Sequence, residues 1–502
     1  MNLTMLLDMA ADGFGDRVVV GSRDGGLTAT RLRELAAGGA RAVQEAGADA
    51  IVYLAVNGPA FQVALFAAAY AGVPLVPVNY RLGQEQIDQL LANHPRAYGI
   101  VETRDTDVVA RSGLVCRTPE QWLTDAAEKG AGVEPEAVLS DCPAVIIYTS
   151  GTTSAPKGVL LRHENLVSYV FGTVEFGAAD AEGAALMSVP PYHIAAVSNA
   201  LTNLFAGRRV LVLENFSPDR WLDLVRGERV TNAMVVPTML ARIMDDDLDR
   251  SVPTLRSLAY GGAKMPPRVI ERALREWPHV DFVNAYGLTE TSSTVTVLGP
   301  EDHRAALQSD DPAVRARLAS AGRPVPGIEL EVRNELDQVV PPGTPGLIWI
   351  RGDQVSGEYA GMGPAVDARG FFFTRDQGRV DEEGYLFVEG RMDDTIIRGA
   401  ENIAPAEIED VLLRHPEVTD AVVVGVPDEE WGQRIEAAVV VRPGAALTPE
   451  GLRAYVRDHL RGSKTPDRIA FWAELPRTVT GKLLRREVVA GLVTAKQSAV
   501  VQ

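Results

Sequence analysis

The stretch that most constrains this chain is AVIIYTSGTTSAPKGV, which covers residues 144–159. It opens with Ala144 to Tyr148, an apolar and partly β-branched run that is typical of a buried strand. A turn rich in hydroxyls and glycine follows from Thr149 to Ser154, where the backbone can bend tightly and turn its N–H groups inward. The single charge is Lys157, behind Pro156. Amides, hydroxyls and one ammonium on a strand–turn–strand unit are the groups that bind a polyphosphate.

An ordinary surface loop has a similar composition, but this turn follows a strongly apolar run directly and carries one lysine as its only charge. The P-loop pattern is also missing, because Gly158 rather than Ser or Thr follows Lys157. The segment therefore predicts a phosphate-binding loop of a different kind. Its expected binding residues are Thr149, Ser150, Gly151, Thr152, Thr153 and Lys157.

The overall composition excludes several classes of function. A chain of 502 residues predicts two to four domains. The 67 acidic residues outnumber the 49 Lys and Arg, and the net charge of −18 argues against nucleic acid or an anionic membrane as the main partner. The longest apolar run, Val63 to Val78, is broken by Gly72 and two prolines and is too short to span a bilayer. The N-terminus has no signal-peptide pattern, so we expect a cytoplasmic protein without a membrane span.

Helical and strand-like segments alternate along residues 1–140, a pattern typical of an α/β fold. The residue pattern predicts helices over 32–44, 61–70, 84–93, 403–413 and 449–460. It predicts strands over 50–56, 74–78, 98–101, 187–193, 419–426 and 434–441. Short strands and turns between residues 321 and 352 predict a small β-barrel or sheet.

Three further segments carry groups suited to a nucleotide. Residues 284–291, NAYGLTET, place an aromatic ring, a glycine, a hydroxyl and a carboxylate close together, which can stack a base, contact a phosphate and hold Mg²⁺. Gly261 and Gly262 follow an expected strand and allow a flat ligand to approach the backbone. The third segment, FFFTRD, ends in Asp376, whose carboxylate can accept a pair of hydrogen bonds.

These segments occur in an order that closely resembles the class I adenylate-forming enzymes, which include acyl- and aryl-CoA synthetases, peptide-synthetase adenylation domains and luciferases. The resemblance runs from about Leu27 to Arg486 and is strongest to fatty-acid or aryl acyl-CoA ligases. It implies a large N-terminal adenylation domain of layered sheets and helices, residues 1–392, with a small β-barrel-like subdomain. It also implies a small mobile C-terminal α/β domain, residues 393–502, with Asp393 as the hinge.

The resemblance also assigns roles to single residues. Thr289 would contact the α-phosphate of ATP, Glu290 would bind Mg²⁺, and Arg391 would contact the ribose with Asp376. Lys482, in the TVTGK loop, would bridge the carboxylate and the phosphate, and His193 would lie beside the carboxylate. Further nucleotide contacts are expected from Gly261, Gly262, Ala263, Asn284, Ala285, Tyr286 and Gly287. Gly399 and Ala400 would line a tunnel for the pantetheine thiol of CoA, and Trp431 is a further candidate CoA contact.

The implied reaction joins a carboxylic acid to AMP with release of pyrophosphate, and then transfers the acyl group to CoA. Amino-acid-activating relatives carry an Asp just after the position of His193, and none occurs from Ile194 to Ala206, so an amino-acid substrate is disfavoured. Small apolar residues at Ala195, Ala196, Val235 and Gly261 predict a fatty or aromatic acid with an uncharged tail.

Two alternatives stay open at this point. The chain could be an acyl-AMP ligase that loads a carrier protein, although the spacing from Asp376 to Arg391 lacks the insertion that blocks domain rotation in many such relatives. It could also be a nucleotide-binding protein with degraded chemistry, because Ser154, Arg375 and Ala400 each stand where the family usually has Gly. The presence of Lys482, Glu290, Asp376 and Arg391 argues against this second alternative.

Overall fold

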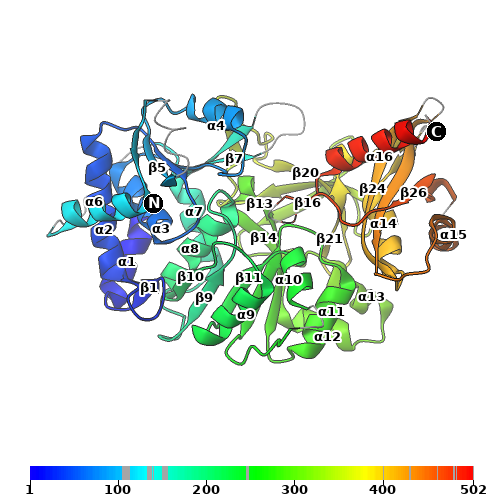
Figure 1. Cartoon of the computed structure of the whole chain (residues 1–502), viewed down its shortest axis with the longest axis horizontal. Helices are drawn as coiled ribbons and strands as arrows, with labels where there is room; N and C mark the ends of the chain where they lie inside the picture. Colours follow the sequence, from blue (N-terminus) through cyan, green and yellow to red (C-terminus); the bar gives the residue numbers. More distant parts are fainter. Residues whose placement is uncertain are drawn as a thin grey trace.

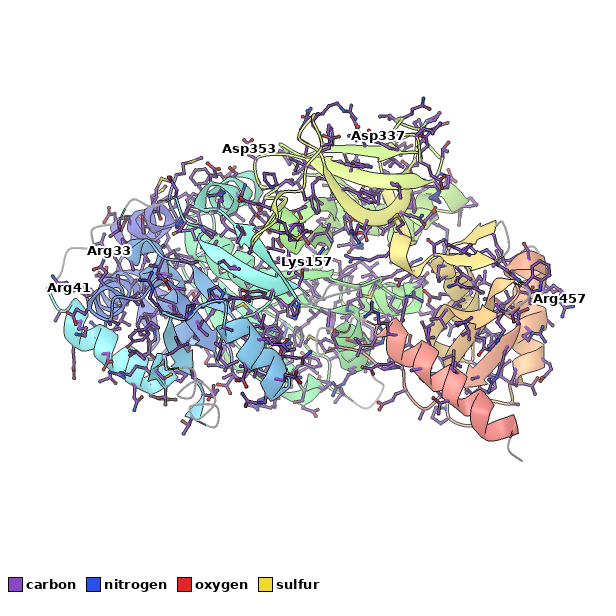
Figure 2. All side chains as sticks on the ribbon, turned by 90° about the horizontal axis from the view of Figure 1, so that it is seen from above. Arg33, Arg41, Lys157, Asp337, Asp353 and Arg457 are labelled. Atoms are coloured by element: carbon purple, nitrogen blue, oxygen red, sulfur yellow. The ribbon has the colours of Figure 1, made fainter. Side chains whose placement is uncertain are left out.

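The structure is a computed structural model that describes residues 1–103, 113–132, 138, 141–149, 156–244, 248–398, 401–428, 431–460, 462–478, 481 and 483–500. A large body holds the N-terminal and central parts of the chain, and a smaller part at one end holds the C-terminal elements (Figure 1). In Figure 2, Lys157 lies near the middle of the molecule, whereas Arg41 and Arg457 mark its two ends.

The first sheet of the large body is mostly parallel and contains the predicted phosphate-binding strand. In spatial order its strands are β19 (Gly363–Pro364), β18 (Glu358–Tyr359), β8 (Lys157–Leu161), β7 (Val145–Thr149), β4 (Leu75–Pro77), β3 (Ile51–Leu54), β5 (Tyr98–Val101) and β6 (Val115–Arg117). Alternation along β3 sends Ile51 and Tyr53 to one face and Val52 and Leu54 to the other. Both faces are therefore covered by apolar side chains, as expected for parallel strands.

The second sheet has parallel strands at its centre and antiparallel strands at both edges. In spatial order its strands are β15 (Arg323–Pro324), β14 (Ser293–Leu298), β13 (Asp281–Leu288), β12 (Ser257–Gly261), β11 (Asn232–Val235), β9 (Ala184–Met187), β10 (Arg209–Val212), β1 (Val18–Val20) and β2 (Leu27–Thr28). The carboxyl ends of β11, β12 and β13 lie together, because their register pairs Met234 with Ala259 and Gly261 with Ala285. Ligands of open α/β sheets bind outside such ends.

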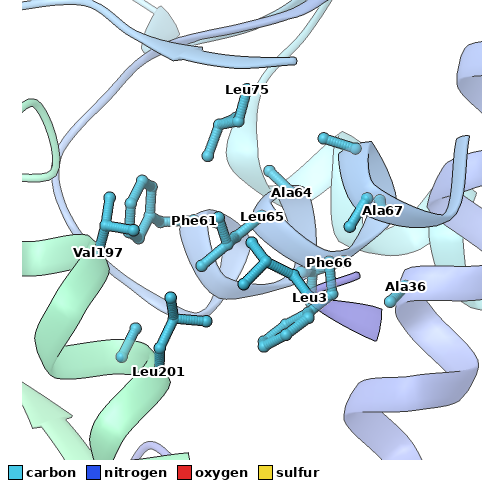
Figure 3. Packing of buried hydrophobic residues seen from close by; sticks show 14 of the residues in the cluster. Leu3, Ala36, Phe61, Ala64, Leu65, Phe66, Ala67, Leu75, Val197 and Leu201 are labelled. Atoms are coloured by element: carbon cyan, nitrogen blue, oxygen red, sulfur yellow. The ribbon is translucent and has the colours of Figure 1, made fainter. Parts of the chain in front are cut away.

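A single apolar cluster fills the space between the two sheets. Its centre is α3 (Pro59–Ala71), which is apolar on all sides and so can be buried completely. Phe61 and Leu65 of α3 face Val197 and Leu201 of α8 (Ile194–Ala206), and Leu75 of β4 lies above them (Figure 3). Other helices that contribute to this cluster are α1 (Thr4–Phe14), α2 (Ala29–Glu45), α6 (Pro119–Gly130) and α7 (His163–Thr173).

The outer faces of the two sheets have their own helices. The first sheet is covered by α4 (Gln84–Leu91). The second sheet is covered by α9 (Pro218–Gly227), α10 (Pro237–Ile243), α11 (Pro267–Glu276) and α12 (Pro300–Gln308). The short helices α13 (Pro312–Ala316) and η3 (Arg317–Ala319) follow α12. The large body therefore consists of alternating helix and sheet layers.

Two smaller units follow along the chain. An antiparallel sheet is formed by β16 (Glu329–Arg333), β17 (Gly346–Arg351), β20 (Phe372–Val380) and β21 (Leu386–Arg391). After η4 (Met392–Asp394), the C-terminal part has its own apolar clusters. Its elements are β22 (Ile396–Arg398), β23 (Glu401–Ile403), α14 (Pro405–Arg414), β24 (Val418–Asp428), β25 (Gly432–Val441), α15 (Pro449–His459), η5 (Gly462–Lys464), β26 (Arg468–Phe471) and α16 (Arg485–Val500).

The predicted α/β class and the expected helices are confirmed, with element ends within three residues of the predicted ones. The strand predicted over 187–193 was wrong, because β9 ends at Met187. Pro190 and Pro191 have no amide hydrogen for a sheet ladder, so the chain leaves the sheet before them. Within the described ranges, no helix combines the length and apolar character needed to cross a membrane.

Two buried histidines make the stability of this fold depend on pH. Burial lowers the pKa of both His163 and His303 to about 4. The ring nitrogen Nδ1 of His163 accepts a hydrogen bond from the Leu3 amide at 3.3 Å, which requires a neutral ring. The folded state therefore binds fewer protons than the unfolded state, so stability is complete above about pH 6.5 and falls as the pH approaches 4.

We expect the His163→Asn variant to lose less stability on acidification, because the amide oxygen keeps an acceptor for Leu3 but does not titrate. At pH 5 each histidine contributes a loss of about 2 kcal/mol relative to pH 8. Urea unfolding at both pH values measures the difference. An equal loss in the wild type and the variant would contradict the assignment.

Candidate active site

The turn after β13 holds Thr289 and Glu290 in a strained but well-defined backbone. The turn is η2 (Thr289–Thr291), and it is followed by two non-glycine residues in the left-handed region, Ser292 with φ 55° and Ser293 with φ 112°. Such positions cost about 1–3 kcal/mol each and persist where the surroundings fix them. Here the Thr291 hydroxyl accepts from the Leu288 amide at 2.9 Å and donates to the Ser293 carbonyl at 2.8 Å.

Glu290 is fixed through both its backbone and its side chain. The amides of Ser356 and Gly357 donate to its carbonyl at 2.9 and 3.3 Å. The hydroxyl of Tyr359, in β18, donates to Oε1 of its carboxylate at 2.8 Å. Burial and the charge of Glu290 both raise the pKa of Tyr359, so this phenol stays protonated and remains a donor. The carboxylate is thereby oriented before any ligand binds.

Lys157 lies next to this pair, at the start of β8. Its Nζ is 5.8 Å from the ring centroid of Tyr359, a cation–π distance. The register of β7 and β8 sets Thr149 directly opposite Lys157. The predicted loop residues Ser150, Gly151, Thr152 and Thr153, together with Ser154, lie outside the described residues. Lys157, at one described end of the loop, thus lies beside Tyr359, and Thr149, at the other end, is paired with Lys157.

Asp376 is the centre of a second group of side chains. Its carboxylate is 6% exposed and is bound on both oxygens: the Tyr286 hydroxyl donates to Oδ2 at 2.6 Å, and Arg391 Nε lies 3.0 Å from Oδ1. Asp376 in β20 and Arg391 in β21 are cross-strand partners. Burial and the Asp376 charge raise the pKa of Tyr286 well above its usual range. A carboxylate has about four acceptor sites, so Asp376 can also accept from a pair of ligand hydroxyls.

The backbone conformation at Arg375 is one that favours glycine. Its backbone has φ 63°, in the left-handed region that glycine adopts without steric cost. The Cβ atom of any other residue is crowded there, by about 1–2 kcal/mol. Arg375 is exposed, whereas its neighbours Thr374 and Asp376 are buried.

Glycine and alanine expose the backbone at several positions near the carboxyl ends of β12 and β13. A Cβ atom on Gly261 would lie 2.3 Å from the carbonyl oxygen of Ala285, and one on Gly287 would lie 1.7 Å from that of Ser293. Both positions therefore require glycine. Gly262 has φ 81° and turns the chain away, with Ala263 following it. Asn284 is used structurally, because its Nδ2 donates to the Ser320 carbonyl at 2.9 Å. The bare backbone gives a flat ligand room to approach.

His193 lies immediately before α8, at the N-terminal end of the helix. Its ring centroid is 4.8 Å from that of Tyr192, which in turn contacts Tyr80 edge-on at 5.4 Å. The aromatic stack positions the imidazole at the helix terminus, where the helix dipole favours a negative group.

Gly481, the residue before Lys482, is one point at which the C-terminal part lies against the large body. Lys482 itself lies outside the described residues, as do Gly399 and Ala400. A Cβ atom on Gly481 would lie 2.7 Å from Oγ1 of Thr238, at the start of α10. The loop is closed by Arg477, whose guanidinium donates to the Gly481 carbonyl at 2.8 Å. The neighbour of Lys482 thus lies beside the carboxyl end of β11.

Trp431 belongs to a different region of the C-terminal part. Its side chain is 46% exposed, and the guanidinium of Arg398 lies 5.5 Å from its ring centroid.

Two residues of the site, Tyr359 and Thr238, were not predicted from the sequence. Neither belongs to a recognisable motif, and Tyr359 is 69 residues from the carboxylate that it orients.

Comparisons with known proteins identify the family of the chain. The profile of the AMP-binding enzyme family matches residues 7–360, and that of the AMP-binding enzyme C-terminal domain matches residues 407–482. A fatty acid–[acyl-carrier-protein] ligase, ScoC, of Streptomyces coeruleorubidus is 33% identical over 473 residues, which cover 89% of this chain and 88% of that protein. A feruloyl-CoA synthase of an Amycolatopsis species is 36% identical over 461 residues, 90% of each chain.

A solved structure gives the same result for the fold. The ATP-bound crystal structure of MatB from Rhodopseudomonas palustris matches with a TM-score of 0.86 and 25% identity, over 98% of this chain and 99% of that one. Family profiles, relatives and fold all point to one group. The chain belongs to the AMP-binding enzyme family, among its adenylate-forming acid–thiol ligases.

Proposed function

We propose that this chain activates a carboxylic acid with an uncharged tail, preferentially an aromatic one, as acyl-AMP and then transfers the acyl group to CoA. The observation that carries the proposal is the arrangement of Tyr286, Asp376 and Arg391 beside the turn of Thr289 and Glu290. One group has the acceptor geometry for a ribose, and the other has the hydroxyl and carboxylate for a phosphate and its metal ion.

In the first step, a carboxylate oxygen of the acid bonds to the α-phosphorus of ATP while the bond to pyrophosphate breaks. Positioning and charge neutralisation supply most of the catalysis in such a transfer. We assign Lys157 and the loop from Thr149 to Thr153 to the β- and γ-phosphates, Thr289 to the α-phosphate, and Lys482 to the carboxylate and phosphate together.

Mg²⁺ would be bound by Glu290 and the phosphates of the nucleotide, and it would offset the charge that develops on the leaving pyrophosphate. Within the part of the chain that the structure describes, no three His, Cys, Asp or Glu side chains gather as a metal site. This agrees with Mg²⁺, which usually binds one or two protein carboxylates together with substrate phosphates. Tyr359 keeps the Glu290 carboxylate oriented for that role.

The acid would lie between α8 and the face of the second sheet that α8 covers. The sequence analysis placed Val235 in this lining, but Val235 packs into the cluster under the opposite face. Its neighbour Met234 points toward α8, where Asn199 Nδ2 donates to the Met234 sulfur at 3.5 Å. A thioether is a weak acceptor, so a hydroxyl on an aromatic ring would bind this amide better. This supports a hydroxylated aryl acid over a plain fatty acid.

Two observations favour CoA as the acceptor of the acyl group. Trp431 and Arg398 offer an exposed aromatic face and a cation, which suit the nucleotide end of CoA. The similarity to a feruloyl-CoA synthase also favours CoA. The similarity to a carrier-protein ligase keeps a carrier protein as the second candidate acceptor.

The C-terminal part, residues 393–502, would change its orientation between the two steps, with Asp393 as the hinge. In the present orientation, the guanidinium of Arg268 donates to the carbonyls of Arg414 and Pro416 at 2.9 and 3.0 Å and also to that of His415. Lys264 forms a 2.6 Å ion pair with Asp410. These contacts would favour the orientation in which Gly481 lies at Thr238, beside the site of adenylation.

The proposed function is tested by pyrophosphate release from MgATP with fatty acids, plain aryl acids and hydroxylated aryl acids. We expect release with a hydroxylated aryl acid and, after CoA is added, the corresponding acyl-CoA. Lys482→Ala is the control and should lower release on the order of 10²- to 10³-fold. Acyl-AMP that accumulates with CoA but is consumed by a carrier protein would instead favour the second acceptor. No release with any acid would contradict the proposal.

The Tyr359→Phe variant should lower the maximal rate of pyrophosphate release by roughly 10- to 100-fold, the value of a hydrogen bond to a charged group. The half-saturating Mg²⁺ concentration should rise, because the Glu290 carboxylate is no longer oriented. A matched control is Tyr385→Phe, which removes a similar 2.6 Å hydrogen bond to Asp302 outside the site. Equal effects of the two variants would contradict the role of Tyr359.

The Arg268→Ala variant should slow adenylation by roughly 10-fold, because losing these contacts costs about 1.4 kcal/mol of the preference for the present orientation. Thioester formation from supplied acyl-AMP should be unchanged or faster. Arg275→Ala is the control, since Arg275 lies on the same helix but pairs with Glu271 within it. Equal slowing of both half-reactions by Arg268→Ala would contradict the proposed movement.

A further inference from the structure

A ladder of three polar side chains runs along one side of α8. Arg208, which follows the C-terminal end of the helix, donates from Nη1 to Oδ1 of Asn203 at 2.8 Å. Asn203 Nδ2 donates in turn to Oδ1 of Asn199 at 2.7 Å and to the backbone carbonyl of Asn199 at 2.8 Å. Asn203 is buried. Asparagine is a poor helix former and a buried amide must be hydrogen-bonded, so this pair indicates a role beyond forming the helix.

The chemistry of its two ends fixes the direction of the ladder. A guanidinium has donors but no acceptor, and a backbone carbonyl has an acceptor but no donor. Asn203 therefore turns its oxygen toward Arg208 and its amino group toward Asn199. The side-chain oxygen of Asn199 faces Asn203, which leaves Asn199 Nδ2 at the far end. The ladder thus ends in a hydrogen-bond donor, and each bond along it polarises the next.

The donor at the end of the ladder meets only a weak acceptor among the described residues. Asn199 Nδ2 lies 3.5 Å from the sulfur of Met234, and a thioether accepts hydrogen bonds poorly. Val197 and Leu201 of α8 face α3 (Figure 3). Asn199 is two residues from each of them and so lies on the opposite side of the helix, toward the second sheet.

The second sheet is incompletely covered next to this amide. Met234 of β11 is paired with Ala259 of β12, and Ala259 is paired with Val283 of β13, so the three side chains point to the same face. All three are half-buried, whereas the residues that precede them, on the opposite face, are buried. This face is therefore open to a ligand beside Asn199.

We propose that Asn199 selects the substrate by donating a hydrogen bond to an acceptor oxygen on the tail of the acid, and that Asn203 and Arg208 are positioning residues that keep this group a donor. The inference rests on the proposed function and deepens it, because a ring oxygen would be favoured over a ring amino group, which is itself a donor. Asn199 follows His193 by six residues, which is about 9 Å of helix. This separation fits an aryl acid with its carboxylate near His193 and an oxygen in the para position.

Three acids of nearly equal size separate acceptor from donor: para-hydroxy-, para-amino- and para-methylcinnamic acid. For the wild type, kcat/KM of pyrophosphate release should be about 10-fold higher with the hydroxy form than with the methyl form, and no higher with the amino form than with the methyl form. Asn199→Leu, which removes the amide but keeps the volume, should abolish the preference for the hydroxy form. Equal use of the hydroxy and methyl forms by the wild type would overturn the inference.

Asn203→Asp tests the direction of the ladder. Aspartate can form an ion pair with Arg208 but has no donor for Asn199, so the Asn199 amide should turn and present its oxygen to the ligand. The amino form should then be used about 10-fold better than the methyl form, because it can donate to that oxygen. A ratio of amino to methyl form that stays at the wild-type value would contradict the positioning role of Asn203.

Asn165→Asp is the matched control, since it makes the same change at a buried asparagine of α7 whose Nδ2 donates to the Asp353 carbonyl at 2.9 Å. It should leave both ratios between the acids at their wild-type values. If the wild type releases pyrophosphate but Asn199→Leu keeps the preference for the hydroxy form, this inference fails and the proposed function stands. Release with no acid of any kind would contradict the proposed function itself, and this inference with it.

Discussion

The ion pair of Asp376 and Arg391, with Tyr286 bound to the same carboxylate, is the contact on which the arrangement of the site depends. It joins β20 and β21 of the small sheet to β13 of the second large sheet. A buried charge that loses its partner costs about 3–5 kcal/mol. The three side chains therefore hold the two sheets in a fixed position relative to each other. Arg391 also ends β21, directly before η4 and the C-terminal part. One buried carboxylate thereby sets the position of both units relative to the parallel strand ends.

Around this fixed centre, the sequence departs from local backbone preferences where a ligand would be bound. Gly261 and Gly287 are required by close approaches of neighbouring carbonyls, whereas Ser292, Ser293 and Arg375 adopt left-handed backbones despite their side chains. Conflicts between local and global preferences are expected at functional sites, because the rest of the fold supplies the stability that they cost. The large apolar cluster around α3 is the source of that stability here.

The sequence predicted the parts of this structure that are encoded locally. The apolar run before Thr149 is β7, the apolar run of residues 61–70 is α3, and the helices predicted over 32–44 and 449–460 are α2 and α15. Tyr286 and Asp376 were identified from short motifs. Tyr359 and Thr238 were missed because their contacts join segments far apart in the chain, for which no spacing rule exists. Val235 was placed on the wrong face because a strand shows its alternation in the sequence but not which face of the sheet meets which helix. That choice is made by packing.

The contacts within the large body differ in strength from those between the large body and the C-terminal part. Within the large body, Asp376 and Glu290 are held by buried or half-buried hydrogen bonds. Across the boundary to the C-terminal part, Lys264 and Asp410 are each more than one-third exposed, and such pairs contribute about 0–1 kcal/mol. Arg268 binds backbone carbonyls at the end of α14, which any residue would present. The groups proposed to bind the nucleotide are therefore preorganised, whereas the contacts that hold Gly481 beside Thr238 are weak enough to be exchanged in the proposed change of orientation.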